Sequence, residues 1–540
     1  MHNLMQDWPL RVSAIIDHAA RFHAGRTLES RSVEGPMVTT TWADVRTQAL
    51  KVSQALLRLG LKPGEVVGVM AWNTGRHMEA WYGIPGAGGI IHTLNPRLFA
   101  DQLVYIINHA EDRILMVDPD LLPIIEGIWE RLDGIRQLIV MTDRAHMPET
   151  ALDVLCYEEL VAAEDGDHRW HEGEERDACG ICYTSGTTGN PKGVVYTHRS
   201  NVIHALASLQ ADTLGLSSRD VLMPVVPLFH ANGWAAAYAA PMAGARMVMP
   251  GRDLTPAALY ELLERGVTIT AAVPTIWMLL LQHIQANNLS FSTLNRVVIG
   301  GASCPRSVIE TFQNDYGVRV LHAWGMTEMS PLGTVCTFKP EVADLPLSEQ
   351  TDVQETVGHP PFTVDLRITD DGGHDLPWDG TSQGRLWTRG PAVVRQYLKG
   401  NGPATEDDQW FDTGDVATMD AHGYVRITDR SKDVIKSGGE WISSIELENA
   451  AVGHPEVAEA AALGMPHPKW DERPILVVVP ADGKDPDKQS ILALVAKKFA
   501  KWQVPDDIVF MAEIPHTATG KISKVTLRQQ LKDQGYALPT

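Results

Sequence analysis

The sequence predicts an α/β protein with a large N-terminal domain of layered α/β sheets, a β-rich lobe and a small C-terminal α+β domain. Short apolar runs alternate with longer helical patterns from about residue 40 to 340, which is typical of parallel α/β layers. Closely spaced short strands follow, and the α/β pattern then returns. The length of 540 residues, of which 44% are hydrophobic, supports two or more domains.

The large N-terminal domain is expected to comprise residues 1–430. Seven apolar runs of strand length lie between its helical patterns, and they predict the central strands of its sheets. These runs cover residues 66–72, 113–118, 136–141, 221–227, 246–250, 270–275 and 297–301.

Between residues 355 and 428 the sequence changes to short strands separated by turns. Asp-Gly and Gly-Gly pairs interrupt alternating residues, as in VDLRITDDGGHDLPWDG and HGYVRITD. This pattern predicts a small β-rich lobe within the large domain. After Asp429 the α/β pattern returns, so we expect a second domain over residues 431–540.

Charge and the N-terminus exclude several classes of protein. The net charge of -21 and the pI near 5.4 argue against a nucleic-acid-binding protein, which needs a basic face. The N-terminus lacks the apolar core of a signal peptide, and no stretch approaches the roughly 18 apolar residues of a membrane span. The five cysteines, an odd number, fit a reducing compartment. We therefore expect a cytoplasmic protein with no nucleic-acid partner and no membrane span.

The single C-x-x-C pair, Cys179 and Cys182, lies in an apolar run that is typical of a strand. No second pair is present to complete a zinc site, so core packing is favoured over metal or redox chemistry. The first 40 residues also include apolar positions suited to cover a partner, which makes a homodimer a hypothesis. These positions are Trp8, Leu10, Val12 and Ile15.

The strongest local signal is the segment YTSGTTGNPKGV at residues 183–194, with three glycines, four hydroxyl residues and one lysine. Glycines let the backbone approach a ligand, hydroxyls donate to phosphate oxygens and Lys192 supplies positive charge. Lys192 is followed by Gly193 and a predicted second strand, so the loop is not a Walker A motif. A hairpin loop without a ligand is the alternative. The composition favours a triphosphate cradle formed by Thr184, Ser185, Gly186, Thr187, Thr188, Gly189 and Lys192.

This loop and six further segments resemble, in the same order, the signatures of the adenylate-forming superfamily. That superfamily contains acyl-CoA synthetases, luciferases and peptide-synthetase adenylation domains. The further segments are PLFHANGW (227–234), GGAS (300–303), WGMTE (324–328), WFDTGD (410–415), DRSKDVIKSGGEWIS (429–443) and TATGKISK (517–524). The resemblance covers nearly the whole chain. It implies an ATP-dependent ligase that forms an acyl-adenylate and then an acyl thioester with coenzyme A, with Mg2+ as cofactor.

The resemblance also implies a nucleotide site. Thr184 and Glu328 correspond to metal-binding residues, with Thr327 near the phosphates. Asp415 and Arg430 match contacts to the ribose and phosphates, where a carboxylate accepts ribose hydroxyls and a guanidinium donates. Outside this series of motifs, Glu328 would be interpreted as a surface acid, and Asp415 and Arg430 as a surface salt bridge. The expected adenine slot comprises Gly301, Ala302 and Trp324, and Gly325 is also expected to contact the nucleotide.

Trp324 departs from the family pattern, in which most members carry tyrosine. The aromatic ring is kept and the hydroxyl is lost. This puts in doubt any hydrogen bond that the hydroxyl would make.

Two half-reactions with different nucleophiles need different surroundings for one acyl carbon, and the family provides them by rotating a mobile C-terminal domain. Lys521 resembles the lysine that stabilises charge at the phosphates, although a lysine in another context would face solvent. Lys436 resembles a second lysine used in thioester formation, and Lys432 matches the hinge. The segment expected to swing toward the pantetheine channel includes Gly438, Glu440 and Trp441.

The acyl pocket is expected beside His230 and Trp234, which a run of alanines follows. Trp234 matches the aromatic gate of long-chain fatty acyl-CoA synthetases, and His230 lies where the family places a residue beside the adenylate. A core histidine is an equal alternative for His230. PLFHANGW contains no acid to pair an α-ammonium group, which argues against an amino-acid substrate.

Details such as SGGEWISSIELENA and HPKWDERP resemble the bacterial fatty acyl-CoA synthetase branch. Within it they are similar to enzymes acting on 3-methylmercaptopropionate and on short to medium fatty acids. An apolar pocket discriminates weakly between such isosteric acids. A long-chain fatty acyl-CoA synthetase, or transfer of the acyl group to a different acceptor, is the alternative.

Three other classes remain open from the sequence. A peptide-synthetase adenylation module is expected to precede a carrier domain, and none follows residue 540. A non-catalytic nucleotide-binding protein is expected to have lost Glu328, Asp415 or Lys521, and all three are present. The motifs do not exclude a luciferase-like oxygenase.

Overall fold

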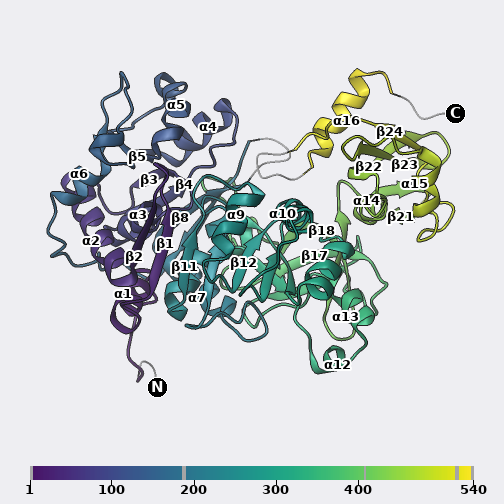
Figure 1. Ribbon diagram of the computed structural model, residues 1–540, viewed down its shortest axis with the longest axis horizontal. Helices are drawn as coiled ribbons and strands as arrows, with labels where there is room; N and C mark the ends of the chain where they lie inside the picture. The colour runs from purple at the N-terminus through teal and green to yellow at the C-terminus, as the bar shows by residue number, and fades with distance from the viewer. Residues whose placement is uncertain (1–3, 185–189, 407–408, 439, 517–521, 537–540) are drawn as a thin grey trace.

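The structure is a computed structural model that describes residues 4–184, 190–406, 409–438, 440–516 and 522–536. Figure 1 shows a large body on the left and centre and a smaller C-terminal lobe at the upper right. The large body contains two mixed sheets and a four-stranded antiparallel sheet, and the C-terminal lobe contains a five-stranded sheet. The predicted fold class is confirmed.

The first mixed sheet has seven strands in the order β7-β6-β5-β3-β4-β8-β9. Every neighbouring pair is parallel except β8 and β9, which form an antiparallel hairpin. The strands are β3 (Val66–Met70), β4 (Ile90–Thr93), β5 (Asp112–Val117), β6 (Gln137–Val140), β7 (Leu155–Cys156), β8 (Ala178–Tyr183) and β9 (Gly193–Thr197).

The second mixed sheet has eight strands in the order β15-β14-β13-β12-β10-β11-β1-β2. Its outer pairs, β14–β15 and β1–β2, are antiparallel, and its inner pairs are parallel. The strands are β1 (Thr27–Arg31), β2 (Met37–Thr41), β10 (Val221–Pro224), β11 (Arg246–Met249), β12 (Ile269–Ala272), β13 (Arg296–Ile299), β14 (Arg319–Gly325) and β15 (Leu332–Val335).

All seven apolar runs identified in the sequence overlap a strand of these two sheets. The strands are shorter than several of the runs, because the apolar residues continue past the end of the strand. After β12, for example, Pro274 opens a helix at its first position, where a missing N–H leaves no bond unmade. After β10, the chain leaves the sheet at Pro224 toward the residues that line the cavity described below.

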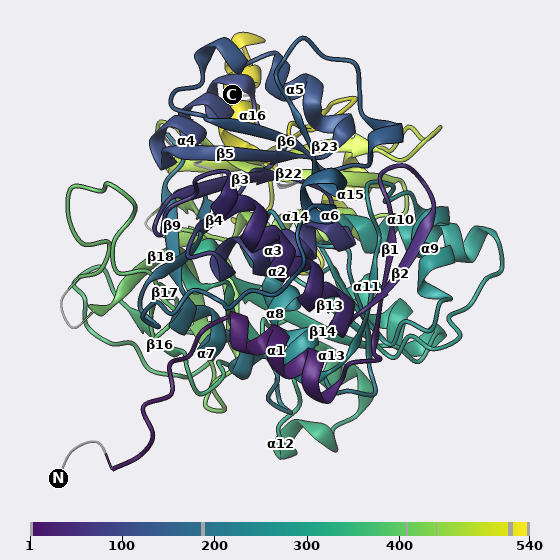
Figure 2. The ribbon, with the colours of Figure 1, turned by 90° about the vertical axis from the view of Figure 1, so that its left-hand side faces the viewer.

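Helices cover these sheets and also lie between them. They are α1 (Ser13–Phe22), α2 (Trp42–Arg58), α3 (Gly75–Gly86), α4 (Ala100–Ala110), α5 (Leu122–Glu126), α6 (Tyr157–Ala162), α7 (His198–Ser208), α8 (Ala236–Ala243), α9 (Pro256–Leu263), α10 (Pro274–Ala286), α11 (Arg306–Glu310), α12 (Pro340–Ala343) and α13 (Leu347–Gln354). Helices α2 and α3 pack side by side (Figure 2).

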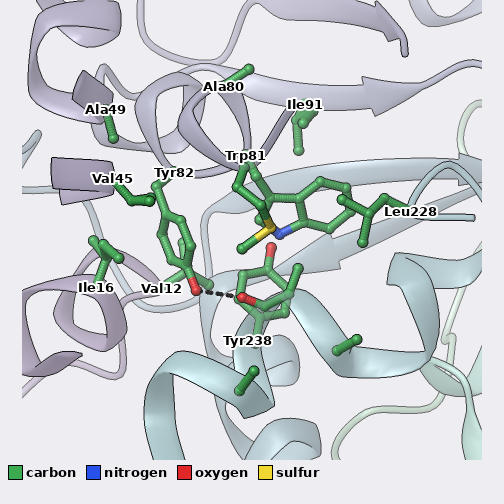
Figure 3. Packing of buried hydrophobic residues seen from close by; sticks show 14 of the residues in the cluster. Val12, Ile16, Val45, Ala49, Ala80, Trp81, Tyr82, Ile91, Leu228 and Tyr238 are labelled. Atoms are coloured by element: carbon green, nitrogen blue, oxygen red, sulfur yellow. Dashed lines mark hydrogen bonds between the residues drawn. The ribbon is translucent and has the colours of Figure 1, made fainter. Parts of the chain in front are cut away.

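The largest core cluster joins both mixed sheets through α3 and α8. At its centre, the rings of Trp81 and Tyr82 from α3 pack against Tyr238 from α8 (Figure 3). The Tyr82 hydroxyl donates to the backbone oxygen of Ala237 at 2.7 Å, so the one polar atom of this ring is satisfied in the core. This shared core fixes the two sheets relative to each other.

The β-rich lobe is an antiparallel sheet in the order β16-β17-β18-β19. Its strands are β16 (Asp365–Thr369), β17 (Gly384–Arg389), β18 (Phe411–Met419) and β19 (Val425–Arg430). The C-terminal sheet comprises β20 (Ile435–Ser437), β21 (Glu440–Ile442), β22 (Val457–His467), β23 (Asp471–Pro480) and β24 (Asp507–Phe510), with α14 (Ser444–Val452), α15 (Lys488–Val495) and α16 (Lys524–Asp533). It has two core clusters of its own, one on each face.

Cys179 and Cys182 are buried in β8, as predicted. Their separation of three residues places them on opposite faces of a strand, so they cannot bind one metal ion together. Burial raises the pKa of the Cys179 thiol to about 12 and that of Cys182 to about 11. Both are therefore neutral core residues.

Two of the four apolar positions considered for a homodimer are buried within their own chain. Val12 and Ile15 are buried in the core of their own chain and cannot cover a partner. Trp8 is 72% exposed, and Leu4 and Met5 are more exposed still. This segment extends away from the body before α1 (Figures 1 and 2). Within the described ranges, no helix is long and apolar enough to cross a membrane.

A buried acid in α3 gives the fold a pH dependence. Glu79 accepts a hydrogen bond from the Tyr157 hydroxyl at 2.6 Å, and burial raises its pKa from 4.5 to about 7. Because the folded pKa is the higher one, the folded state binds the extra proton, and stability is lost as the pH rises from about 4.5 through 7. The difference corresponds to roughly 3 kcal/mol.

Glu79→Gln should remove this loss, since a neutral amide can still accept from Tyr157. When the pH is raised from 5 to 8, the free energy of unfolding of the variant should increase by up to roughly 3 kcal/mol relative to that of the wild type. Denaturant unfolding at both pH values measures the difference. An equal stability difference at pH 5 and pH 8 would contradict the prediction. Exposed Glu349→Gln is the matched control.

Candidate active site

A cavity of about 1240 Å³ lies between the mixed sheets, the β-rich lobe and the C-terminal domain. It brings together most of the described residues that the sequence singled out. Those on its wall are Thr184, Lys192, His230, Trp234, Gly301, Ala302, Trp324, Gly325, Thr327, Glu328, Arg430 and Lys432. Residues 185–189 and Lys521 lie outside the described residues.

The β8–β9 hairpin positions the ends of the phosphate loop. Tyr183 is opposite Gly193 in the antiparallel register, which confirms the predicted strand–loop–strand arrangement. The Thr184 N–H donates to the Lys192 carbonyl at 2.9 Å, and the Lys192 N–H donates to Thr184 Oγ1 at 3.3 Å. These bonds close the base of the loop and hold Thr184 and Lys192 on the cavity wall.

Glu328 lies in a 3-10 helix, Thr327–Met329, directly after β14. The side chain is buried, with 8% exposed, and burial raises its pKa. Its Oε1 accepts a hydrogen bond from the Tyr397 hydroxyl at 2.8 Å. The Tyr196 hydroxyl donates to the Thr327 carbonyl at 2.7 Å and fixes the backbone of the motif.

Asp415 lies behind the cavity wall rather than on it. It is 2% exposed, and both of its carboxylate oxygens have partners. Arg430 Nε binds Oδ1 at 2.7 Å, and the Trp324 indole N–H donates to Oδ2 at 2.8 Å. The predicted contact of this carboxylate with the ribose hydroxyls stays a prediction. In the structure the carboxylate anchors Trp324 and Arg430, both of which line the cavity.

The tryptophan at position 324 therefore supplies its own hydrogen bond. The hydroxyl lost relative to tyrosine is replaced by an indole donor that reaches Asp415. This orients the ring on the cavity wall, and the sequence alone gave no sign of it.

Close packing requires glycine at position 300, and a positive φ angle favours glycine at position 301. A Cβ on Gly300 would lie 2.9 Å from the Ala323 carbonyl and 3.2 Å from the Trp234 ring. Gly301 has a φ of +82°, which favours glycine. Trp234 and Ala235 also have positive φ angles, of 53° and 69°. Non-glycine residues adopt this conformation rarely, and such strain clusters at ligand sites.

Much of the cavity wall is apolar. Among the described lining residues between positions 214 and 323, none is acidic. The apolar side chains there include Leu214, Leu216, Leu222, Ala236, Ala239, Ile269, Ala271, Val298 and Ala323. These side chains are suited to contact an uncharged acyl group, and His230 and Trp234 lie on the same wall.

The C-terminal domain presents one face to the cavity. His516, Ile522 and Lys524 line it, and Asn449 Nδ2 of α14 donates to Ser303 Oγ at 2.9 Å. The β20–β21 hairpin lies elsewhere. Its predicted site residues are not among the described residues of the wall; they are Lys436, Gly438, Glu440 and Trp441.

The cavity wall also includes four residues that were not expected from the sequence: Tyr397, Glu448, Asn449 and Lys524. The Tyr397 hydroxyl contacts Glu328, and the Lys524 ammonium group contacts Glu448. Asn449 and Glu448 lie on α14. Lys524 stands in the recognised segment TATGKISK, so its motif was a usable signal. The other three have no distinguishing local pattern, because their partners are far away in the chain.

The chain is similar to known proteins over nearly its whole length. The AMP-binding enzyme family matches residues 17–398, and the AMP-binding enzyme C-terminal domain matches residues 446–521. The 3-methylmercaptopropionyl-CoA ligase of Ruegeria pomeroyi is 50% identical over 527 residues, covering 97% of this chain and 98% of the relative. The medium-chain-fatty-acid–CoA ligase of Ectopseudomonas oleovorans is 43% identical over 530 residues, covering 97% and 96%.

A solved structure shares the fold over nearly the whole length. The anthranilate CoA ligase AuaEII, in complex with anthranoyl-AMP, superimposes with a TM-score of 0.86 at 25% identity. The match covers 98% of this chain and 100% of that chain. The chain therefore belongs to the AMP-binding enzyme family. Within that family its activity is that of an AMP-forming acid–CoA ligase, which uses ATP and coenzyme A.

Proposed function

We propose that the carboxylic acid activated by this ligase is 3-methylmercaptopropionate, with short and medium fatty acids as further substrates. The observation that carries the proposal is the 50% identity to a 3-methylmercaptopropionyl-CoA ligase over 97% of the chain. The apolar side chains of the cavity wall support it, because a thioether carries no charge and is at most a weak hydrogen-bond acceptor. A medium-chain ligase at 43% identity supports the second group of acids.

For the first half-reaction, we assign charge neutralisation to the residues around the phosphate loop. Lys192 supplies a positive charge at the cavity wall, and Arg430 supplies a second. Trp324 offers a ring face to the adenine, and its bond to Asp415 holds that ring in place. The carboxylate of the acid and the α-phosphate of ATP are both anions, so nearby positive charge is needed for the in-line attack of one on the other.

Mg2+ fits the residues present. The described residues contain no cluster of three or more metal-binding side chains. Mg2+ commonly takes one or two carboxylates and completes its shell with substrate phosphates and water. Glu328 and Thr184, which line the same cavity, would hold it in this way. When bound, it would neutralise charge on the triphosphate.

For the second half-reaction, we propose that the C-terminal domain rotates about Lys432. The hairpin with Lys436, Gly438 and Trp441 would then replace the face that carries His516 and Ile522 at the cavity. Lys521 is assigned to the first step and Lys436 to the second. We place the domain boundary at residues 430 and 431, between β19 and β20.

We further propose a homodimer in which the exposed N-terminal arm covers a second copy. Leu4, Met5 and Trp8 are the exposed apolar residues of that arm. The five cysteines are buried free thiols, which supports a reducing compartment, the cytoplasm.

The substrate proposal is tested by pyrophosphate release over a panel of acids, with and without coenzyme A. We expect kcat/KM to be highest for 3-methylmercaptopropionate and its near-isosteric fatty acids, and to fall for amino acids and long chains. One methylene changes binding by roughly 1–3 kcal/mol, so neighbouring acids should differ by about 10- to 200-fold at most. A clear preference for a long-chain or an amino acid would refute the assignment.

A further inference from the structure

Tyr397 contacts two groups of opposite charge in the cavity. Its hydroxyl donates to Glu328 Oε1 at 2.8 Å, and Lys192 Nζ lies 4.8 Å from the centre of its ring. All three side chains line the cavity. One phenol therefore binds the carboxylate at its edge and the ammonium group on its face.

The backbone around Tyr397 is bonded to both motifs. The Val394 N–H donates to the Glu328 carbonyl at 2.7 Å, and the Leu398 N–H donates to the Gly193 carbonyl at 2.8 Å. A Cβ on Gly193 would lie 3.1 Å from Leu398 Cβ, so the two chains are also in close contact. The segment from Val394 to Leu398 thus spans from the acidic motif to the strand after the phosphate loop.

The charges of Lys192 and Glu328 explain why a phenol between them is useful. Lys192 and Glu328 carry opposite charges, and a direct ion pair between them would neutralise both. The lysine would then be less available to a triphosphate and the carboxylate less available to a metal ion. A ring face attracts an ammonium group through its quadrupole without removing its charge. A phenol hydroxyl likewise leaves a carboxylate charged and able to bind further groups.

We propose that Tyr397 is a positioning residue that holds Lys192 on its ring face and Glu328 at its hydroxyl, so that the lysine meets the triphosphate and the carboxylate meets Mg2+. The inference rests on the proposed role of Glu328 toward Mg2+. Tyr397 acts through these two side chains and takes no part in bond making or breaking.

Two variants separate the functions of the ring and the hydroxyl. Tyr397→Phe keeps the ring and removes the donor, and Tyr397→Leu removes both. The readouts are the Kd of ATP by calorimetry without Mg2+, and the Mg2+ concentration that half-saturates ATP binding. Neither depends on turnover. Tyr260→Phe, whose hydroxyl donates to the Ser290 carbonyl on the surface, is the matched control.

For Tyr397→Phe we expect an unchanged Kd of ATP without Mg2+ and a rise of roughly tenfold in the half-saturating Mg2+ concentration. For Tyr397→Leu we expect the same rise in Mg2+ and, in addition, an ATP Kd raised by about three- to tenfold without metal. A role confined to folding would lower the yield of active protein without shifting either constant of the remainder.

Glu328→Gln distinguishes the failure of this inference from that of its basis. If Glu328→Gln shifts the Mg2+ dependence and Tyr397→Phe does not, the role of Tyr397 is refuted while that of Glu328 stands. If Glu328→Gln leaves the Mg2+ dependence unchanged, the metal assignment is wrong and the inference falls with it. Equal ATP Kd values for Tyr397→Leu and Tyr397→Phe without metal would refute the role of the ring.

Discussion

Replacing Glu328 with glutamine should slow acyl-adenylate formation by roughly 10²- to 10³-fold. The side chain is buried on the cavity wall, and removal of one preorganised charged group from such a site has effects of this size. The amide oxygen still accepts the hydrogen bond from Tyr397, so the local structure should be retained. ATP–pyrophosphate exchange at saturating acid measures this step separately from thioester formation.

The control for this variant is Glu349→Gln, which removes an exposed acid from α13. Thermal unfolding of Glu328→Gln should match the wild type or exceed it, because a buried charge with a raised pKa is removed. An exchange rate within threefold of the wild type would show that Glu328 has no part in the first half-reaction.

Replacing Lys524 with methionine should destabilise the C-terminal domain by about 3–5 kcal/mol. Its side chain is 10% exposed, and Nζ lies 2.7 Å from Glu448 Oε1 and also contacts Ser444. Burial lowers the pKa of Lys524, but Glu448 and Asp429 raise it by more, so the lysine is charged. Without it, the buried Asp429 and the half-buried Glu448 lose their common partner.

The loss should be larger at pH 8 than at pH 5. Burial raises the pKa of Asp429 from 3.8 to about 6 even with Lys524 present, and removal of the lysine should raise it further. An acid with a raised folded pKa loses stability as the pH rises through that value. Calorimetric unfolding at both pH values tests this, with exposed Lys532→Met on the same helix as the control.

A second substitution tests the cause. Glu448→Gln in the Lys524→Met background should recover part of the lost stability, because one unpaired charge is removed. Additive losses in the double variant would show that the two side chains do not act as a pair.

Most of the fold could be predicted because it follows from local periodicity. Each apolar run between residues 66 and 301 overlaps a strand, because a buried parallel strand carries apolar side chains on both of its faces. The Asp-Gly and Gly-Gly turns likewise predicted the β-rich lobe. Strand ends were less predictable, because Pro224 and Pro274 end a hydrogen-bonded ladder within runs that remain apolar.

The candidate site was predictable only where a motif carries its own chemistry. The hairpin of Thr184 and Lys192 has a composition that indicates phosphate, and the structure places both residues on the cavity wall. The partners of Asp415 could not be predicted in this way. Its two oxygens bind Trp324 and Arg430, which are 91 and 15 residues away in the chain.

The sequence by itself determined the layered α/β class and the order of the motifs. Those properties depend on residue type and on spacing within short segments. Only the tertiary structure decided that Tyr397 joins Lys192 to Glu328, that Trp324 donates to Asp415, and that Lys524 pairs with Glu448. Each of these contacts joins residues at least 69 positions apart, and packing of separate elements, rather than local pattern, brings such residues within hydrogen-bonding distance.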